Sequence, residues 1–169
     1  MAHIFRGRYA GRIDGSFVVF LIGMRVNKPW KVAEWLPVAR AMPTMLQELY
    51  SHPEKGFLGG EMFLSFANRA PALVQYWRSF DHLDHFARDR NDIHLPAWRE
   101  FNRRVGGVGS VGIWHETYLV EPGRYEAIYG NMPRFGLGKV AEHLPAGGRL
   151  ETARRRLGGD DTPGVEPSY

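Results

Sequence analysis

The sequence predicts an α+β protein in which two helices cover one face of a four-stranded antiparallel sheet. Three observations support this fold class. Segments with strand and helix patterns follow one another in the order β-α-β-β-α-β-β. The first six of these match the ferredoxin-like arrangement, which leaves one extra C-terminal strand. The chain of 169 residues has the length of a single hydrophobic core.

The first predicted strand is residues 16–26, a continuous run of β-branched and aromatic residues that is typical of a strand buried on both faces. After a turn, apolar residues recur every three or four positions over residues 35–49, which predicts a helix with one buried stripe. Proline lacks an amide hydrogen, so Pro37 and Pro43 are expected to divide or kink this helix. The residues before position 16 are polar and rich in glycine, and no strand is predicted there.

A hairpin and a second helical region follow. Residues 61–67 alternate between the two faces of a strand, and a short turn leads to a third strand at residues 72–78, which favours antiparallel pairing. Ser79 is a suitable N-cap for a helix that begins at Phe80. The helical spacing of apolar residues is interrupted after this helix begins and resumes over residues 96–105.

The last two predicted strands are residues 111–120 and 125–131. Because the helices cover only one face of the sheet, the other apolar face needs a cover, and a homodimer is expected. Residues 1–146 are interpreted as the domain. Residues 147–169 contain few large apolar side chains and are expected to form a flexible tail.

Composition excludes several function classes. Without any cysteine, the chain has no disulfide, thiolate nucleophile or cysteine-ligated zinc or iron–sulfur site, and a cytoplasmic location is expected. No apolar stretch is long enough for a membrane span or resembles a signal peptide. The net charge is +4, but basic residues are scattered among 18 acidic ones, so no nucleic-acid partner is expected.

Two blocks carry a resemblance to a known family. They are QYWRSFDHLDHFARDRNDIHLPAWREFNRRVG, residues 75–106, and GIWHETYLVEPGRYEAIYGNMPRFGLG, residues 112–138. This region resembles a monooxygenase-like family, formerly of unknown function, that includes a fungal member of the fumagillin pathway. The resemblance implies the dimeric α+β barrel fold. That superfamily includes cofactor-free oxygenases, haem-dependent enzymes and proteins that only bind ligands, so the fold alone does not select the chemistry.

The resemblance also implies a place for haem b. In haem-degrading relatives the ligating histidine lies near the end of the helix that follows a Trp-basic-Ser sequence, here Trp77-Arg78-Ser79, and His94 has a comparable position. A neutral imidazole can ligate haem iron. Phe86 stands near the position where haem degraders carry a tryptophan, which weakens the case for haem degradation itself. The alternative is that His94 caps the second half-helix or forms a hydrogen bond within the joint between the two half-helices.

Cofactor-free oxygenation is the other chemical hypothesis. It needs an acidic organic substrate, a base and a dry, anion-binding pocket. His115 is a candidate base if its side of the strand faces the helices, whereas the alternative is a hydrogen-bonded histidine at the dimer face. The candidate catalytic residues are therefore His94, His115 and Arg78, and the candidate substrate-binding residues are Arg25, Tyr76, Trp77, Phe86, Trp98 and Trp114.

Two functions follow from these residues. The first is a small monooxygenase-like enzyme that oxidises a hydrophobic metabolite in a cavity between sheet and helices, with haem bound through His94 or without a cofactor. The second is a non-catalytic dimer that binds a small molecule or haem in the same cavity. The expected partners are a hydrophobic small molecule and a second copy of the chain.

Overall fold

The computed structural model describes residues 2–89, 99, 101–103 and 107–159. These residues fall into two compact units, one formed by the described residues of 18–119 and the other by those of 1–17 and 120–159. Each unit has its own antiparallel sheet. The elements of the larger unit are β2 (Phe17–Val26), α1 (Val32–Ser51), η1 (Pro53–Lys55), β3 (Phe57–Ser65), β4 (Ala70–Trp77), α2 (Phe80–Arg88) and β5 (Val111–Val120). The first residue of β2 and the last residue of β5 are assigned to the smaller unit.

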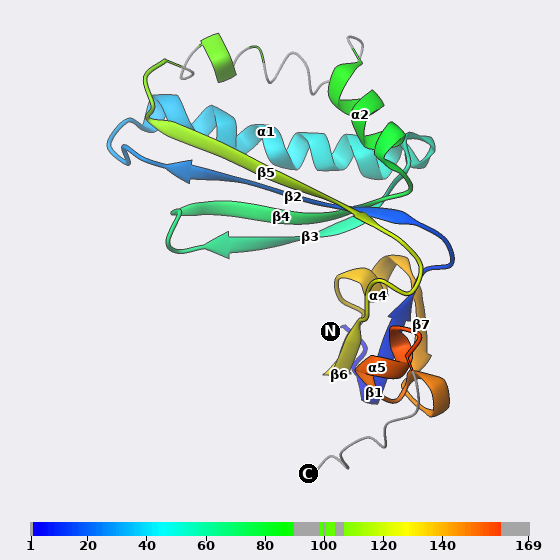
Figure 1. The fold of residues 1–169 in the computed structure, drawn as a ribbon. Coiled ribbons are helices and arrows are strands. Elements are labelled where there is room, and N and C mark those ends of the chain that lie inside the picture. The colour runs from blue at the N-terminus through cyan, green and yellow to red at the C-terminus, as the bar shows by residue number, and fades with distance from the viewer. Residues whose placement is uncertain (1, 90–98, 100, 104–106, 160–169) are drawn as a thin grey trace. The chain divides into compact units, whose positions relative to one another are not determined.

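The sheet of the larger unit has the strand order β3-β4-β2-β5, which confirms the predicted ferredoxin-like arrangement. The strand β4 pairs antiparallel with both β2 and β3. The helices α1 and α2 lie on one face of this sheet (Figure 1). The last of these strands, β5, has the predicted bounds, and β3 begins four residues earlier than predicted.

The helix α1 runs without division from Val32 to Ser51, so the expectation that its prolines divide it is wrong, whereas the alternative, a kink, stays a prediction. Both Pro37 and Pro43 lie on the exposed side of the helix. Their rings therefore face water, where solvent can satisfy the carbonyl groups that a proline leaves unpaired. The buried stripe of α1 is unaffected and ends in Leu49, which is 2% exposed.

The predicted cap of α2 is confirmed. The Ser79 hydroxyl accepts a hydrogen bond from the His82 amide at 3.3 Å and lies 2.7 Å from the His82 Nδ1 atom. The cap fixes the start of a short helix whose inner residues Leu83 and Phe86 are buried. They join Val18, Leu49, Phe57 and Trp77 in one hydrophobic cluster.

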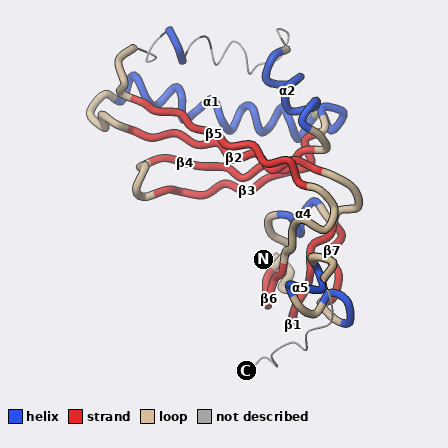
Figure 2. Tube along the Cα trace, in the orientation of Figure 1, coloured by secondary structure: helices blue, strands red, loops and turns tan. Residues whose placement is uncertain are grey.

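The smaller unit is built from both ends of the chain, as the strands in Figure 2 show. Its sheet has the order β6-β1-β7, and β1 pairs antiparallel with both neighbours. The elements of this unit are β1 (Phe5–Arg12), β6 (Ile128–Met132), α4 (Leu137–Val140), β7 (Glu142–Pro145), η2 (Gly148–Leu150) and α5 (Ala153–Arg156). The strand β1 lies in a segment for which the sequence predicted none.

Part of the segment assigned to a flexible tail carries η2 and α5. The Arg156 side chain is 6% exposed and forms an ion pair with Glu126 at 2.7 Å. Its Nη1 also donates to the carbonyl oxygens of Leu150 and Glu151. The boundary at residue 146 stays a prediction, and these contacts connect residues on both of its sides.

An aromatic cluster around His143 forms part of the smaller unit. The imidazole stacks on Tyr9 at 4.6 Å between ring centroids and meets the edge of Phe5 at 4.8 Å. Both ring nitrogens are buried and have no hydrogen-bond partner among the described residues. Burial, and to a smaller extent the charge of Arg134, lowers the pKa of His143 from its ordinary value of 6.5.

This lowered pKa predicts a pH-dependent stability. Because the unfolded chain binds a proton at His143 more readily, the stabilisation is complete above the ordinary pKa and is lost as the pH falls toward the folded value. The His143→Phe variant keeps an aromatic ring and should flatten the loss of stability between about pH 7 and about pH 5. Urea unfolding at the two pH values measures it, and parallel losses in both proteins would contradict the prediction.

Candidate active site

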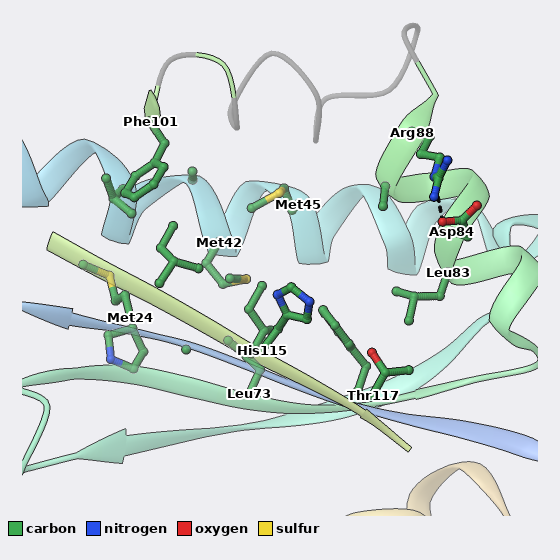
Figure 3. A pocket seen from close by; sticks show the side chains of 18 of the residues that line it. Met24, Met42, Met45, Leu73, Leu83, Asp84, Arg88, Phe101, His115 and Thr117 are labelled. Atoms are coloured by element: carbon green, nitrogen blue, oxygen red, sulfur yellow. Dashed lines mark hydrogen bonds and ion pairs between the residues drawn. The ribbon is translucent and has the colours of Figure 1, made fainter. Parts of the chain in front are cut away.

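A cavity of about 530 Å³ lies in the larger unit, between the helix-covered face of the sheet and the helices α1 and α2 (Figure 3). Its volume is in the usual range for a site that binds an organic molecule. The apolar side chains that line it are Phe20, Ile22, Met24, Val38, Ala41, Met42, Met45, Pro71, Leu73, Phe80, Leu83, Ala87, Phe101 and Ile113. The polar ones among the described residues are Asp84, Arg88, His115 and Thr117.

Strand periodicity explains which residues reach the cavity. Alternate residues of a strand point to the same face, so Ile113, His115 and Thr117 of β5 line the cavity together. The condition placed on His115 is therefore met, because its side of the strand faces the helices. The ring of His115 packs against Phe20 at 5.6 Å between centroids. Neither ring nitrogen of His115 has a hydrogen bond to another described residue, which leaves it available to a ligand.

A second polar pair lines the cavity from α2. Asp84 and Arg88 are four residues apart, so they lie one turn apart on the same side of the helix. The Nε atom of Arg88 donates to Asp84 Oδ1 at 2.8 Å. The cavity thus combines an imidazole and a hydroxyl on β5 with an ion pair on α2, and the other described side chains of its lining are apolar.

Three methionines make the apolar lining adaptable. Met42 and Met45 come from α1, and Met24 comes from β2. The unbranched thioether side chain changes rotamer at low cost and fits surfaces of different shape. The cavity is therefore suited to a hydrophobic molecule without a single rigid outline.

Two of the predicted substrate-binding residues belong to the core. Trp77 is fully buried, and its ring packs against Phe57 and Phe86 at 5.4 and 5.6 Å between centroids. Its indole nitrogen donates to Gln75 Oε1 at 3.0 Å. Neither Trp77 nor Phe86 is among the residues that line the cavity, so the structure gives them a packing role next to it.

Trp114 and Tyr76 lie on the face of the sheet that the helices do not cover. Trp114 is one residue from His115 and therefore points the other way, and Tyr76 alternates in the same manner with the buried Trp77. The indole of Trp114 lies flat against β2 at Gly23, where an added Cβ would come within 2.7 Å of the ring. Its Nε1 atom is buried and finds no acceptor among the described residues.

Two other predicted site residues, Arg25 and Arg78, are not among the residues that line the cavity. The guanidinium of Arg25 is exposed and donates to Asn27 Oδ1, the Ala67 carbonyl and Asn68 Oδ1. Arg78 is exposed just after β4, and its amide donates to the Gly56 carbonyl at 2.8 Å. Among the described residues, the arginine that lines the cavity is Arg88.

His94 and Trp98 lie outside the described residues, so their predicted roles stay predictions. Within the described lining, His115 is the one imidazole that could ligate a haem iron, and Arg88 is the one cation that could pair with a haem propionate. These donors and the apolar walls fit a haem group. Within the described residues, no three His, Asp or Glu side chains are grouped so that they could hold a metal ion directly.

Sequence reasoning missed the roles of Thr117, Asp84 and Arg88. A usable signal existed for Thr117, which shares a strand face with His115. For the α2 pair the signal was weaker, because a charged pair one turn apart usually lies on a solvated helix face. The described helices include none that is both long and apolar enough to span a membrane.

Comparisons with known proteins identify relatives. A protein-family model described as Monooxygenase af470-like matches residues 17–137. The protein "Monooxygenase af470" of Aspergillus fumigatus is 24% identical, over an alignment that covers 98% of this chain. The chain covers 66% of that relative's length, slightly less than two thirds. The matched region includes the whole described lining of the cavity.

Solved structures support the fold. An aldoxime dehydratase crystallised with butyraldoxime has a TM-score of 0.65 and 15% identity, and the match covers 83% of this chain and 43% of the dehydratase. A second aldoxime dehydratase structure gives a TM-score of 0.60 at 15% identity, with 83% and 44% of the two chains covered. At this identity the likeness concerns the fold only.

Proposed function

The chain belongs to the monooxygenase af470-like family, and on that premise we propose that it is a small monooxygenase that oxidises a hydrophobic organic metabolite. The observation that carries the proposal is the cavity of about 530 Å³, with apolar walls and His115 exposed to its interior. Such a site binds an organic molecule, excludes water from most of its surface and presents the His115 imidazole as an acid–base group.

The proposed reaction needs no cofactor. His115 removes a proton from an acidic C–H group of the substrate, and the apolar walls keep the resulting carbanion from water. The carbanion passes electrons to molecular oxygen. In the overall reaction a CH₂ group and O₂ give a carbonyl group and water, so one oxygen atom enters the product and both hydrogen atoms leave in water. The substrate itself is the reductant.

Oxygen uptake with dithranol, a hydrophobic and acidic anthrone, tests this function. We expect the protein to accelerate the reaction above its spontaneous rate. Ala41→Trp fills the cavity from α1 and should remove at least about nine-tenths of the acceleration. Ala33→Trp is the control, because Ala33 is exposed on the same helix and does not line the cavity.

Two results would contradict the proposal. Equal rates with the Ala41→Trp and wild-type proteins, both folded by circular dichroism, would place the reaction outside the cavity. Binding of dithranol without oxygen uptake would favour the alternative function, a non-catalytic protein that binds hydrophobic small molecules.

Haem b is the alternative cofactor hypothesis, and the availability of the His115 imidazole supports it. His94 remains the ligand that the family resemblance implies. Haem would supply an iron centre that activates oxygen or substrate, whereas the apolar walls would exclude water from it. An absorption spectrum of the purified protein, before and after addition of hemin, distinguishes the haem-dependent from the cofactor-free version.

We also propose a homodimer paired through the sheet face opposite the helices. In the larger unit this face carries apolar side chains that include Val19, Leu21, Phe63, Val74 and Trp114. A partner copy would bury them and could offer an acceptor to the Trp114 indole. Light scattering at micromolar concentration should give twice the chain mass of 19.3 kDa. A monomer under these conditions would refute the pairing.

A further inference from the structure

We propose that the substrate is an organic acid whose anionic head binds Arg88, with its apolar body extending past His115 toward Met24. This inference rests on the proposed function and adds a substrate class to it. It comes from the way in which polar groups are distributed along the cavity. In Figure 3, Asp84 and Arg88 lie toward one end, Met24 and Phe101 toward the other, and His115 between them.

At the end of the cavity near Met24, the described residues offer no charge. Met24 belongs to a hydrophobic cluster with Val26, Ala70 and Val111, against which Val38, Phe101 and Ile113 pack. Four of these residues, Met24, Val38, Phe101 and Ile113, also line the cavity. A charged or strongly polar group placed there would lose its hydration without gaining a hydrogen bond, which is unfavourable. The apolar part of a ligand therefore belongs at this end.

At the other end lies the guanidinium group of Arg88, which has further hydrogen-bond donors besides the one that binds Asp84. The Nε atom of Arg88 is held by Asp84 Oδ1 at 2.8 Å, whereas no described residue accepts a hydrogen bond from its two terminal nitrogens. The Arg88 side chain is 79% exposed, so its charge lies at the rim of the cavity. A carboxylate matches the paired donors of a guanidinium edge in shape and charge.

An anion fits this end better than a cation. The Asp84 side chain is 36% exposed, less than half the value for Arg88, and one of its oxygens is already bound to Arg88. A positively charged head would meet the more exposed arginine before it reached the carboxylate. The chain as a whole carries a net charge of +4, which also favours the approach of anions.

This placement gives a role to each polar side chain of the described lining. The head is fixed on α2, the body lies along β5, and His115 faces a position within the molecule rather than its end. Thr117 is two residues from His115 on the same face of β5, and its hydroxyl can hydrogen-bond a substrate oxygen. Arg88 is thus a specificity-determining residue, and Asp84 is a positioning residue that holds its Nε atom.

Calorimetric titration with three ligands that share one aromatic body tests the inference. The ligands are 2-naphthylacetate, 2-naphthaleneethanol and 2-(2-naphthyl)ethylammonium. The wild-type protein should bind the acid about tenfold more tightly than the alcohol, and the ammonium ion most weakly. Arg88→Gln should remove the preference for the acid and leave the affinity for the alcohol unchanged. Arg40→Gln, an exposed α1 change of the same charge that does not line the cavity, should keep the preference.

The outcomes separate this inference from the proposed function. Equal affinities for acid and alcohol in the wild-type protein, or tightest binding of the ammonium ion, would overturn the inference and leave the apolar ligand site intact. Retention of the preference by Arg88→Gln would also overturn it. Failure of all three ligands to bind would overturn both the inference and the proposed use of the cavity.

Discussion

Replacement of His115 by alanine should lower the rate of dithranol oxidation by about 10²- to 10⁴-fold, the usual contribution of a general base. The imidazole faces the cavity, and the described residues give it no competing hydrogen bond, so its removal leaves the substrate proton without an acceptor. Stability should change little, because His115 is exposed. Stopped-flow oxygen uptake at saturating substrate measures the rate.

The matched control is His85→Ala, since His85 has a side chain that is 80% exposed on α2 and does not line the cavity. This variant should keep the wild-type rate. If His115→Ala kept it as well, the base would lie elsewhere, and His94 would become the next candidate. A lower affinity for dithranol with an unchanged maximal rate would assign His115 to binding alone.

Replacement of Trp77 by alanine should lower the free energy of unfolding by about 3–5 kcal/mol, the usual cost of truncating a buried aromatic side chain. Trp77 has no exposed surface, and its removal leaves a space between Phe57 and Phe86. It also takes away the donor that satisfies the buried Gln75. Urea unfolding followed by circular dichroism measures the loss.

The control for this prediction is Trp30→Ala, because Trp30 is 75% exposed and should contribute little to stability. Trp77→Phe should fall between the two, since it keeps much of the packing and loses the hydrogen bond. A Trp77→Ala protein with nearly unchanged stability but impaired ligand binding would restore the sequence-based role of Trp77 as a substrate-binding residue.

The larger sheet could be predicted from sequence because its strands carry strong local patterns. β5 is rich in β-branched and aromatic residues, and β2 begins with a continuous apolar run from Phe17 to Met24. β1 has neither feature: Arg6 is exposed and Arg8 is half-buried, and Gly7 adopts a φ of +88° between them, where the register with β6 shifts. Its strand character comes from pairing with β6 and β7, which a local pattern does not reveal.

The site was harder to predict than the fold. Alternation along β5 separated His115 from Trp114, but only the position of the helices decides which of the two faces a cavity. Trp77 shares the helix-covered face with Leu73, which lines the cavity, yet it lies among core side chains. That difference depends on how α1 and α2 pack. Likewise, the sequence contains many arginines, and only the fold shows that Arg88 is the one in the described lining of the cavity.

The division of the smaller unit between the two ends of the chain has a consequence for folding order. Residues 18–119 form an uninterrupted stretch, so the larger unit can assemble while later residues are still being synthesised. β1 is synthesised before its pairing partners β6 and β7, so it can join its sheet only after both of them have been synthesised. The side chain that accepts the Gly7 amide hydrogen bond, Asn131, is 124 positions away. Closing so long a loop is slow and entropically costly unless the intervening residues are already compact. We therefore expect the larger unit to fold first and the sheet of the smaller unit to form after it.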